Sequence, residues 1–353
     1  HDRNGLTSSD SVTVTVDTQP PSISITSPAQ GGFVNDADVA VSWFGADSGA
    51  GISYYVVSIE GLASFNTTGT SCVFSDLDDG AYTVMVSAYD QLGNYRDVTA
   101  TFTVDTLAPT LAIISPVEGR SFNETSLTVS WTSSDANPGV AHVRFDGGAW
   151  EAANDQLYIR TALSEGHHIV DIRVTDAAGN ARVASVNFTV DTIAPAVSFV
   201  YPNEGSLVNS SIGIVEWSTD GASSSIRMDG GEWTNVGQNT SWTYSLEDGE
   251  HTIEVKVTDH AGNSALAALN IVVDATAPTA EYSPLGEGTG LDQVILVEFS
   301  EAMNQTSVTI SVSGVSGTLA WEGNVVTFTP SDLEFGREYA VNVSGMDLAG
   351  NAI

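Results

Sequence analysis

Residues 90–109 read DQLGNYRDVTATFTVDTLAP, and this stretch decides the architecture of the chain. It joins the turn motif Asp-x-x-Gly-Asn to a second aspartate 15 residues after the first and a proline four residues later. The same combination returns at 176–195 and 259–278. A degenerate copy lies at 2–21, and the motif alone stands at 347–351. Because the copies lie 83 to 88 residues apart, the chain is predicted to be a tandem array of repeats.

Two further landmarks keep the register of the repeat. A large aromatic residue follows one proline of each repeat by fifteen positions, and a turn with glycine precedes each Asp-x-x-Gly-Asn motif by ten or eleven positions. The aromatic residues are Trp43, Trp131, Trp217 and Phe299. The distance from the tryptophan to that glycine varies (37, 35 and 32 residues), which predicts a shared fold with variable middle loops.

Period-two alternation of apolar and polar residues predicts β-strands at 11–16, 39–43, 82–88, 98–104 and 168–174. No stretch of ten or more residues has a helical period. Six or seven short strands in about 85 residues, with the tryptophan on the second strand, predict an all-β chain with one β-sandwich per repeat. Short linkers that contain proline favour an extended rod.

The chain of 353 residues carries 44 acidic and 10 basic residues, a formal net charge of −34. Nucleic acid and anionic membranes are therefore excluded as partners over most of the surface. Two explanations of the charge remain open. Salt-rich surroundings would screen the repulsion between surface acids, or the acids bind hard cations. The aspartates at fixed repeat positions favour metal binding, and the other acids favour a solvated acidic face.

Other features exclude further classes of protein. No apolar run of 18 residues is present, so no membrane span is predicted. The single cysteine, Cys72, excludes an internal disulfide framework and is predicted to be a small buried residue. Gly-x-Ser-x-Gly, His-Glu-x-x-His and phosphate-loop motifs are all missing from the sequence, so the chain is predicted not to be an enzyme.

Several motifs together resemble the immunoglobulin-like (Ig-like) tandem repeats of bacterial and archaeal cell-surface proteins. They are Val-Asp-Thr-x-Ala-Pro, Ser-Pro-x-x-Gly, the tryptophan strand and Asp-Gly-x-(Tyr/His) leading to Asp-x-x-Gly-Asn, within residues 17–274. Residues 299–304, 326–330 and 345–351 resemble instead the bacterial Ig-like subfamily of S-layer proteins. The resemblance implies structural or adhesive work outside the cell.

The repeat register divides the chain into a closing strand of a preceding Ig-like unit and four Ig-like repeats, the last without its final strand. The predicted bounds are 1–17, 18–105, 106–191, 192–274 and 275–353. One hypothesis is head-to-tail self-association, in which the strand at 11–16 completes the last repeat of another subunit and builds a filament. The alternative is that both ends are cuts in a longer chain, completed by flanking residues.

Three acids of each repeat are predicted to converge where the chain enters the sandwich. One lies in the entering linker, one in the loop after the tryptophan strand and one in the Asp-x-x-Gly-Asn loop. Oxygen-only ligands suit Ca²⁺, whereas Mg²⁺ demands a stricter octahedron and Zn²⁺ favours His or Cys. The simpler interpretation is that these residues only build tight turns. The predicted calcium ligands are Asp17, Asp47, Asp90, Asp105, Asp135, Asp176, Asp191, Asp220, Asp259, Asp274, Glu301 and Asp347.

Two other sets of residues have predicted roles. An aromatic ring or imidazole after the conserved turn glycine predicts a tyrosine-corner contact to backbone rather than catalysis. These corner residues are Tyr82, His168, His251 and Tyr339. The chain also has seven N-glycosylation sequons. Their asparagines are Asn66, Asn123, Asn187, Asn209, Asn239, Asn304 and Asn342.

The sequence thus favours an extracellular stalk, surface-layer or filament segment stiffened by calcium. A second interpretation is an adhesin whose variable loop at 48–75 binds surface glycans or neighbouring surface proteins. A third is an accessory array of a large secreted hydrolase. Fold resemblance alone does not choose among them.

Overall fold

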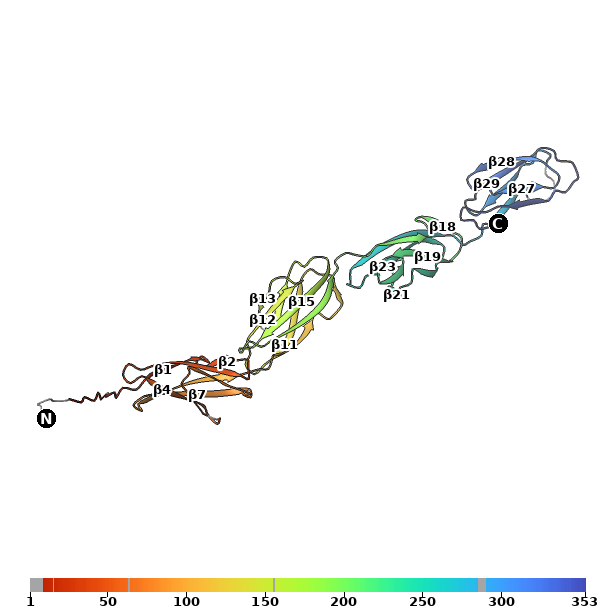
Figure 1. Ribbon diagram of the computed structural model, residues 1–353. Helices are drawn as coiled ribbons and strands as arrows, with labels where there is room; N and C mark the ends of the chain where they lie inside the picture. The colour runs from red at the N-terminus through yellow and green to blue at the C-terminus, as the bar shows by residue number, and fades with distance from the viewer. Residues whose placement is uncertain (1–8, 15, 63, 155, 285–289) are drawn as a thin grey trace, which may run out of the picture. The chain divides into compact units, whose positions relative to one another are not determined.

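The computed structural model describes residues 9–14, 16–62, 64–154, 156–284 and 290–353, and every regular element in them is a β-strand (Figure 1). The chain divides into two compact units. One comprises the residues up to Arg120 with Glu124–Val190, and the other comprises Ser121–Asn123 with Asp191–Ile353. The degenerate motif copy at 2–5 lies outside the described residues.

The first repeat is a sandwich of a three-stranded and a five-stranded sheet. The first sheet has the order β1 (Ser22–Ser27), β3 (Val39–Ala46) and β6 (Ser71–Phe74). The second has the order β2 (Gly32–Val34), β8 (Tyr95–Val104), β7 (Gly80–Asp90), β4 (Ile52–Ile59) and β5 (Phe65–Thr67). The predicted strands at 39–43, 82–88 and 98–104 all lie within these elements.

The second and third repeats have the same two sheets. In the second repeat, the three-stranded sheet has the order β14 (Leu157–Arg160), β11 (Leu127–Ser134) and β9 (Thr110–Ser115). Its five-stranded sheet has the order β10 (Arg120–Phe122), β16 (Ala181–Val190), β15 (Gly166–Thr175), β12 (Val140–Phe145) and β13 (Glu151–Ala153). In the third repeat, the three-stranded sheet has the order β17 (Val197–Tyr201), β19 (Ile212–Thr219) and β22 (Ser241–Ser245). Its five-stranded sheet has the order β18 (Ser206–Val208), β24 (Ser264–Val273), β23 (Gly249–Thr258), β20 (Ser223–Met228) and β21 (Thr234–Gly237).

The fourth repeat has a different strand order. Its larger sheet is β25 (Ala280–Ser283), β26 (Ile295–Phe299), β29 (Val325–Pro330) and β28 (Gly317–Glu322). Its smaller sheet pairs β27 (Thr309–Val312) with β30 (Val341–Ser344). In the described part of the chain, each sheet takes its strands from one repeat. The repeats are therefore separate sandwiches joined by linkers.

One strand prediction is wrong. The tryptophan lies on the third strand of each of the first three repeats, because a three-residue strand precedes it; in the first repeat this is β2, which pairs in parallel with β8. Three residues are too short to show a period of two. The strand at 11–16, which needs a partner from a preceding unit or another subunit, stays a prediction: its described residues are not in a sheet here, and Val12, Val14 and Val16 are 87%, 74% and 82% exposed. Without a pairing partner, alternation alone does not make a strand.

Each sandwich encloses its own apolar core. Along β3, Val39, Val41 and Trp43 are buried and Ala40 and Phe44 are exposed, which is the alternation expected of a strand with one face inward. The aromatic residues at the equivalent position of the other repeats, Trp131, Trp217 and Phe299, are also buried. Cys72 is half-buried against the first core, and this burial raises the pKa of its thiol.

The predicted corner contacts are present in all four repeats. The Tyr82 hydroxyl donates to the Asp78 carbonyl at 2.9 Å. The Nε2 atoms of His168 and His251 lie 2.8 Å from the carbonyl oxygens of Ser164 and Glu247. In the fourth repeat the Tyr339 hydroxyl instead accepts a hydrogen bond from the Glu334 amide. These side chains hold turns together, in agreement with a structural role for the histidines.

The two corner histidines should titrate above the usual imidazole range. Burial by itself lowers the pKa of His168, but hydrogen bonds to the Ser164 carbonyl and the Asp146 carboxylate outweigh it and raise the pKa. The hydrogen bond to Asp229 is the main cause of the raised pKa of His251. Because the folded-state pKa is raised, each histidine stabilises the fold below its unfolded pKa of about 6.5 and loses this contribution as pH rises through the folded pKa.

We expect an NMR pH titration to show both raised values. Asp146→Asn should bring the pKa of His168 down and leave that of His251 unchanged, since each imidazole has its own carboxylate partner. A His168 pKa that is insensitive to Asp146→Asn would contradict the assignment.

Candidate metal centres

The Asp-x-x-Gly-Asn loop is a closed hydrogen-bonded turn. In the second repeat, Asp176 Oδ1 accepts from the amides of Gly179 and Asn180 at 2.7 and 2.8 Å. Gly179 has a backbone φ of +99°, which residues other than glycine rarely adopt. This backbone conformation explains the glycine of the motif. Asp176 is only 5% exposed. The motif therefore presents a nearly buried carboxylate at a fixed position.

The motif asparagine also ties the loop to the entering linker, a role that the sequence did not reveal. Asn180 Nδ2 donates to Asp176 Oδ2 at 2.8 Å and to the backbone carbonyl of Asp105 at 2.7 Å. The same pair of bonds recurs in every repeat. The linker contacts are Asn94 to Asp17 (3.1 Å), Asn263 to Asp191 (2.6 Å) and Asn351 to Asp274 (2.7 Å).

Three clusters of three acids form as predicted. In each, one carboxylate oxygen per residue lies within 4.8 Å of the other two. The clusters are Asp17 with Asp47 and Asp90, Asp105 with Asp135 and Asp176, and Asp274 with Glu301 and Asp347. Their motif acids are almost fully enclosed, since Asp90, Asp176 and Asp347 are 2%, 5% and 1% exposed.

Hydrogen bonds from the loop after the tryptophan strand hold the linker acid in the first two clusters. Asp17 Oδ2 accepts from the Ala50 amide at 2.8 Å, and a Cβ on Gly49 would lie only 2.0 Å from that oxygen, so a larger residue at 49 would have to displace the Asp17 carboxylate. In the second cluster, Asn137 Nδ2 donates to Asp105 Oδ2 at 2.7 Å. These contacts hold the linker acid against the loop that follows the tryptophan strand.

The electrostatics of the clusters differ between members. Burial by itself raises the pKa of Asp90, but hydrogen bonds from the Asn94 side chain and from loop amides outweigh it, so the pKa lies below its usual value. Burial and then the negative charges of Asp274 and Asp347 raise the pKa of Glu301. The loop amides therefore favour an ionised motif aspartate, whereas the neighbouring acids oppose ionisation of Glu301.

The third junction does not assemble the predicted cluster. Among the described residues, Asp191, Asp220 and Asp259 do not form a group like the other three. Asp220 is exposed, and its Oδ1 accepts from the Ala196 amide of the linker at 2.7 Å. Counted from the strand tryptophan, Asp47 and Asp135 stand at the fourth position, whereas Asp220 stands at the third and Gly221 at the fourth. This one-residue offset turns the carboxylate away.

At this junction the turn itself is intact. Asp259 Oδ1 accepts from the amides of Ala261, Gly262 and Asn263 at 2.7 to 2.9 Å. Burial raises the pKa of Asp259, but the Asn263 side chain and these amides outweigh it and lower the pKa. Here the simpler interpretation, that the motif builds a tight turn, describes what the residues do.

The donor chemistry of the three clusters fits a hard cation. Every converging ligand atom is a carboxylate oxygen, and three such groups within 4.8 Å repel one another unless protons or a cation intervene. Ca²⁺ accepts six to eight oxygen ligands in flexible geometry. The motif asparagine holds the backbone carbonyl of the linker acid close to the motif carboxylate, since its Nδ2 donates to both.

All seven sequon asparagines have exposed side chains. Asn187 differs from the others in one respect that its sequence position did not reveal. Its Nδ2, the atom that would carry a glycan, donates to Glu118 Oε1 at 2.8 Å. A glycan at Asn187 would have to displace this contact. Separately, the described residues contain no helix long and apolar enough to cross a membrane.

Three family models match the chain. Residues 109–192 match the model described as glucodextranase, domain B, and residues 214–275 and 274–353 match two models described as bacterial Ig-like domain. These matches agree with the sandwiches seen in the structure. The chain is therefore a tandem array of Ig-like repeats, and its third and fourth repeats are similar to bacterial Ig-like domains.

The chain is also similar to individual proteins. It is 27% identical over 179 residues to halomucin from Haloquadratum walsbyi (strain DSM 16790 / HBSQ001), a match that covers 48% of this chain and 2% of halomucin. Fibronectin(III)-like modules of Clostridium thermocellum CbhA are 20% identical, cover 48% of this chain and 94% of their own, and give a TM-score of 0.37. A tetra-tandem repeat from the extending region of a large adhesion protein is 20% identical, with 95% and 97% coverage and a TM-score of 0.33.

Proposed function

We propose that this chain is a structural segment of an extracellular or cell-surface protein, in which calcium ions join three of the linkers to the repeats that follow them. The observation that carries the proposal is the convergence of three acids from distant parts of the sequence, together with an asparagine that holds the linker carbonyl in the same place. Domains of the bacterial Ig-like class serve as structural or adhesive modules, which favours this role over catalysis.

The proposed stiffening follows from where the cluster acids lie in the chain. Asp105 directly follows β8, the last strand of the first repeat, whereas Asp135 and Asp176 belong to loops of the second. An ion held by all three would join the end of one sandwich to two loops of the next. Asp274, after β24, stands in the same relation to Glu301 and Asp347. Calcium would supply the positive charge that makes this arrangement favourable.

Small-angle X-ray scattering of the whole chain tests the proposal. Removal of calcium with a chelator should broaden the distribution of interdomain distances, because the linkers lose their link to the loops. Asp105→Ala should broaden it in calcium as well, by loosening one hinge while the neighbouring sandwiches stay folded. Identical scattering curves with calcium and with chelator would refute the stiffening role.

Self-association into a filament or surface layer is a further part of the proposal. Stiff segments assemble with a smaller loss of conformational freedom than flexible ones. Analytical ultracentrifugation with and without calcium tests it, and a monomer under both conditions at high concentration would exclude it. Intact-mass measurement of the native protein tests whether the seven exposed sequons carry glycans.

A further inference from the structure

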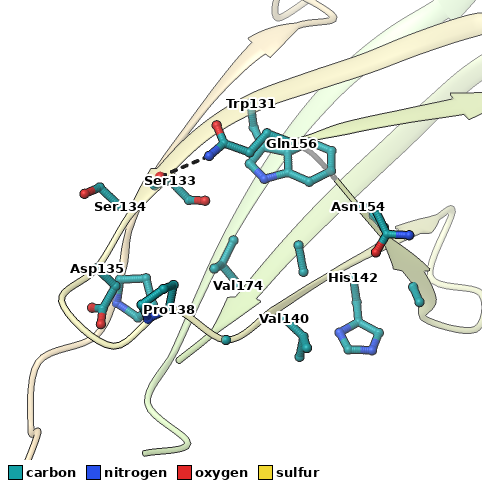
Figure 2. Close-up of a pocket in the computed structure, with 15 residues that line it drawn as sticks. Trp131, Ser133, Ser134, Asp135, Pro138, Val140, His142, Asn154, Gln156 and Val174 are labelled. Atoms are coloured by element: carbon teal, nitrogen blue, oxygen red, sulfur yellow. Dashed lines mark hydrogen bonds between the residues drawn. The ribbon is translucent and has the colours of Figure 1, made fainter. Parts of the chain in front are cut away.

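The second repeat contains a pocket that lies beside its three-acid cluster and shares Asp135 with it. It has a volume of about 620 Å³, inside the range usual for small-molecule sites. Trp131 and Val174 form part of its wall (Figure 2), and Ala153 is another of its lining residues. Asp135, a member of the acidic cluster, lies among the outer lining residues (Figure 2).

An unpartnered hydrogen-bond donor faces this pocket. Trp131 is 2% exposed, and its buried Nε1 has no hydrogen-bond partner among the described residues, as is also true of Trp43 Nε1 in the first repeat. Figure 2 shows the indole nitrogen on the side of the ring that faces Val174. The Nδ1 atom of His142, another lining residue, is also buried and has no partner within the described part of the chain. A buried polar group that lacks a partner lowers the stability of the fold by about 1–3 kcal/mol. A ligand or an ordered water that bonded to these two atoms would recover this loss.

In the first and third repeats, a larger or polar side chain stands beside the buried tryptophan where the second repeat has its pocket. The equivalent position is found from the sheet pairing, because it lies opposite the residue two before the motif aspartate. It is occupied by Tyr55 in the first repeat, Ala141 in the second and Ser224 in the third. The Tyr55 ring packs edge-on against Trp43 at 5.5 Å. Ser224 Oγ accepts from Trp217 Nε1 at 3.2 Å.

Alanine at this position therefore creates the pocket. Ala141 offers neither a ring to fill the space nor an oxygen for the indole N–H. The first repeat also accommodates its tyrosine through Gly45, where a Cβ would lie 2.5 Å from the Tyr55 hydroxyl. The equivalent residue of the second repeat, two after the tryptophan, is Ser133.

The chemistry of the lining disfavours an anion and suits a polyhydroxylated ligand, since the one carboxylate of the described lining, Asp135, belongs to the three-acid cluster. The described lining residues include no lysine or arginine, and the chain carries a net charge of −34, so an anionic ligand would be repelled. Val174 and Ala153 supply apolar surface, and Gln156 and Asn154 supply amides at the edge. A pyranose ring matches this mixture, since it has apolar C–H faces and hydroxyl oxygens that accept hydrogen bonds.

We propose that this pocket of the second repeat binds a neutral hexopyranose unit of a glycan, with a sugar hydroxyl accepting the Trp131 indole hydrogen bond. The apolar face of the sugar would cover Val174 and Ala153. The side-chain amides of Gln156 and Asn154 at the pocket edge would form hydrogen bonds with the remaining hydroxyls. This binding activity goes beyond the structural role of the array, and the polar groups proposed to hold the sugar, on Trp131, Gln156 and Asn154, lie outside the three-acid cluster.

The test is an NMR titration of the intact chain with the methyl α-glycosides of glucose, galactose and mannose. The seven tryptophans give separate indole N–H signals, and Trp131→Phe identifies the signal of Trp131. We expect at least one glycoside to shift this signal saturably while the Trp43 and Trp217 signals stay in place. The titration is repeated in chelator, where the shift should persist. A Trp131 signal that none of the three glycosides moves would overturn the proposal.

Two variants copy the solutions found in the other repeats. The double variant Ala141→Tyr with Ser133→Gly reproduces the Tyr55–Gly45 pair and should abolish the shift by filling the pocket. Ala141→Ser should give the indole an internal acceptor, as Ser224 does for Trp217, and should weaken binding about tenfold, the equivalent of one hydrogen bond. Undiminished binding by a folded double variant, or by the milder Ala141→Ser, would also count against the proposal.

Discussion

Calorimetric titration of the chelator-treated chain is expected to show three bound calcium ions, one for each three-acid cluster. Since calcium would bind the folded form and not the unfolded one, it should also raise the melting temperature. The added stability is about 2.7 kcal/mol for a site when free calcium is 100 times its Kd. Titration and melting curves that are the same with and without calcium would refute the metal assignment.

The chain provides a matched pair of variants for this experiment. Asp135→Asn and Asp220→Asn change equivalent-looking acids after the tryptophan strand, and asparagine can still accept the local hydrogen bonds from backbone amides. Asp135 belongs to a cluster and Asp220 does not. Asp135→Asn should therefore remove one of the three sites, whereas Asp220→Asn should leave all three. Loss of a site in Asp220→Asn would mean that the third junction also binds calcium.

Trp217→Ala should unfold the third repeat while the first stays folded. Trp217 is 3% exposed in a core of its own, and truncation of a buried tryptophan costs about 3–5 kcal/mol. This is a large part of the roughly 5–15 kcal/mol that stabilises a typical domain. Hydrogen exchange measured by mass spectrometry should show fast exchange in β19 and β23 and unchanged protection in β3 and β7.

Trp233→Ala is the control in the same repeat. Trp233 is 37% exposed and lies under the Arg227 guanidinium, 4.5 Å from its ring centroid. Loss of such a cation–π contact costs about 0.5–1 kcal/mol. Protection of β19 and β23 should therefore stay close to that of the parent chain. Equal exchange in both variants would show that the Trp217 core does not hold the repeat together.

Much of the fold could be predicted because it is encoded locally. Alternation along β3 and β7 follows from the two-residue period of a strand, and the glycine of each motif follows from the positive φ of its turn. The repeat spacing then gave the equivalent positions in the other sandwiches. The short strand β2, which belongs to the other sheet, could not be predicted, because three residues are too few to show the alternation of a strand.

The candidate sites show where local sequence stops being sufficient. The order of residues alone was enough to predict that a linker acid, a loop acid and a motif acid converge, and the structure brings them together in three of four junctions. It could not show that the motif asparagine reaches back to the linker carbonyl, because that contact joins residues 72 to 77 positions apart.

Two single-residue differences became meaningful only in three dimensions. Asp220 looks like Asp135 in the sequence, yet an offset of one residue from the tryptophan turns its carboxylate to the linker amide. Ala141 looks like an ordinary strand residue, yet across the sheet it stands where Tyr55 and Ser224 satisfy or cover a buried tryptophan. The sequence by itself determined the repeat, the strands and the acids that could meet. Which side chains do meet, and which space stays open, was decided by the tertiary structure, because side-chain direction and packing depend on partners far away in the chain.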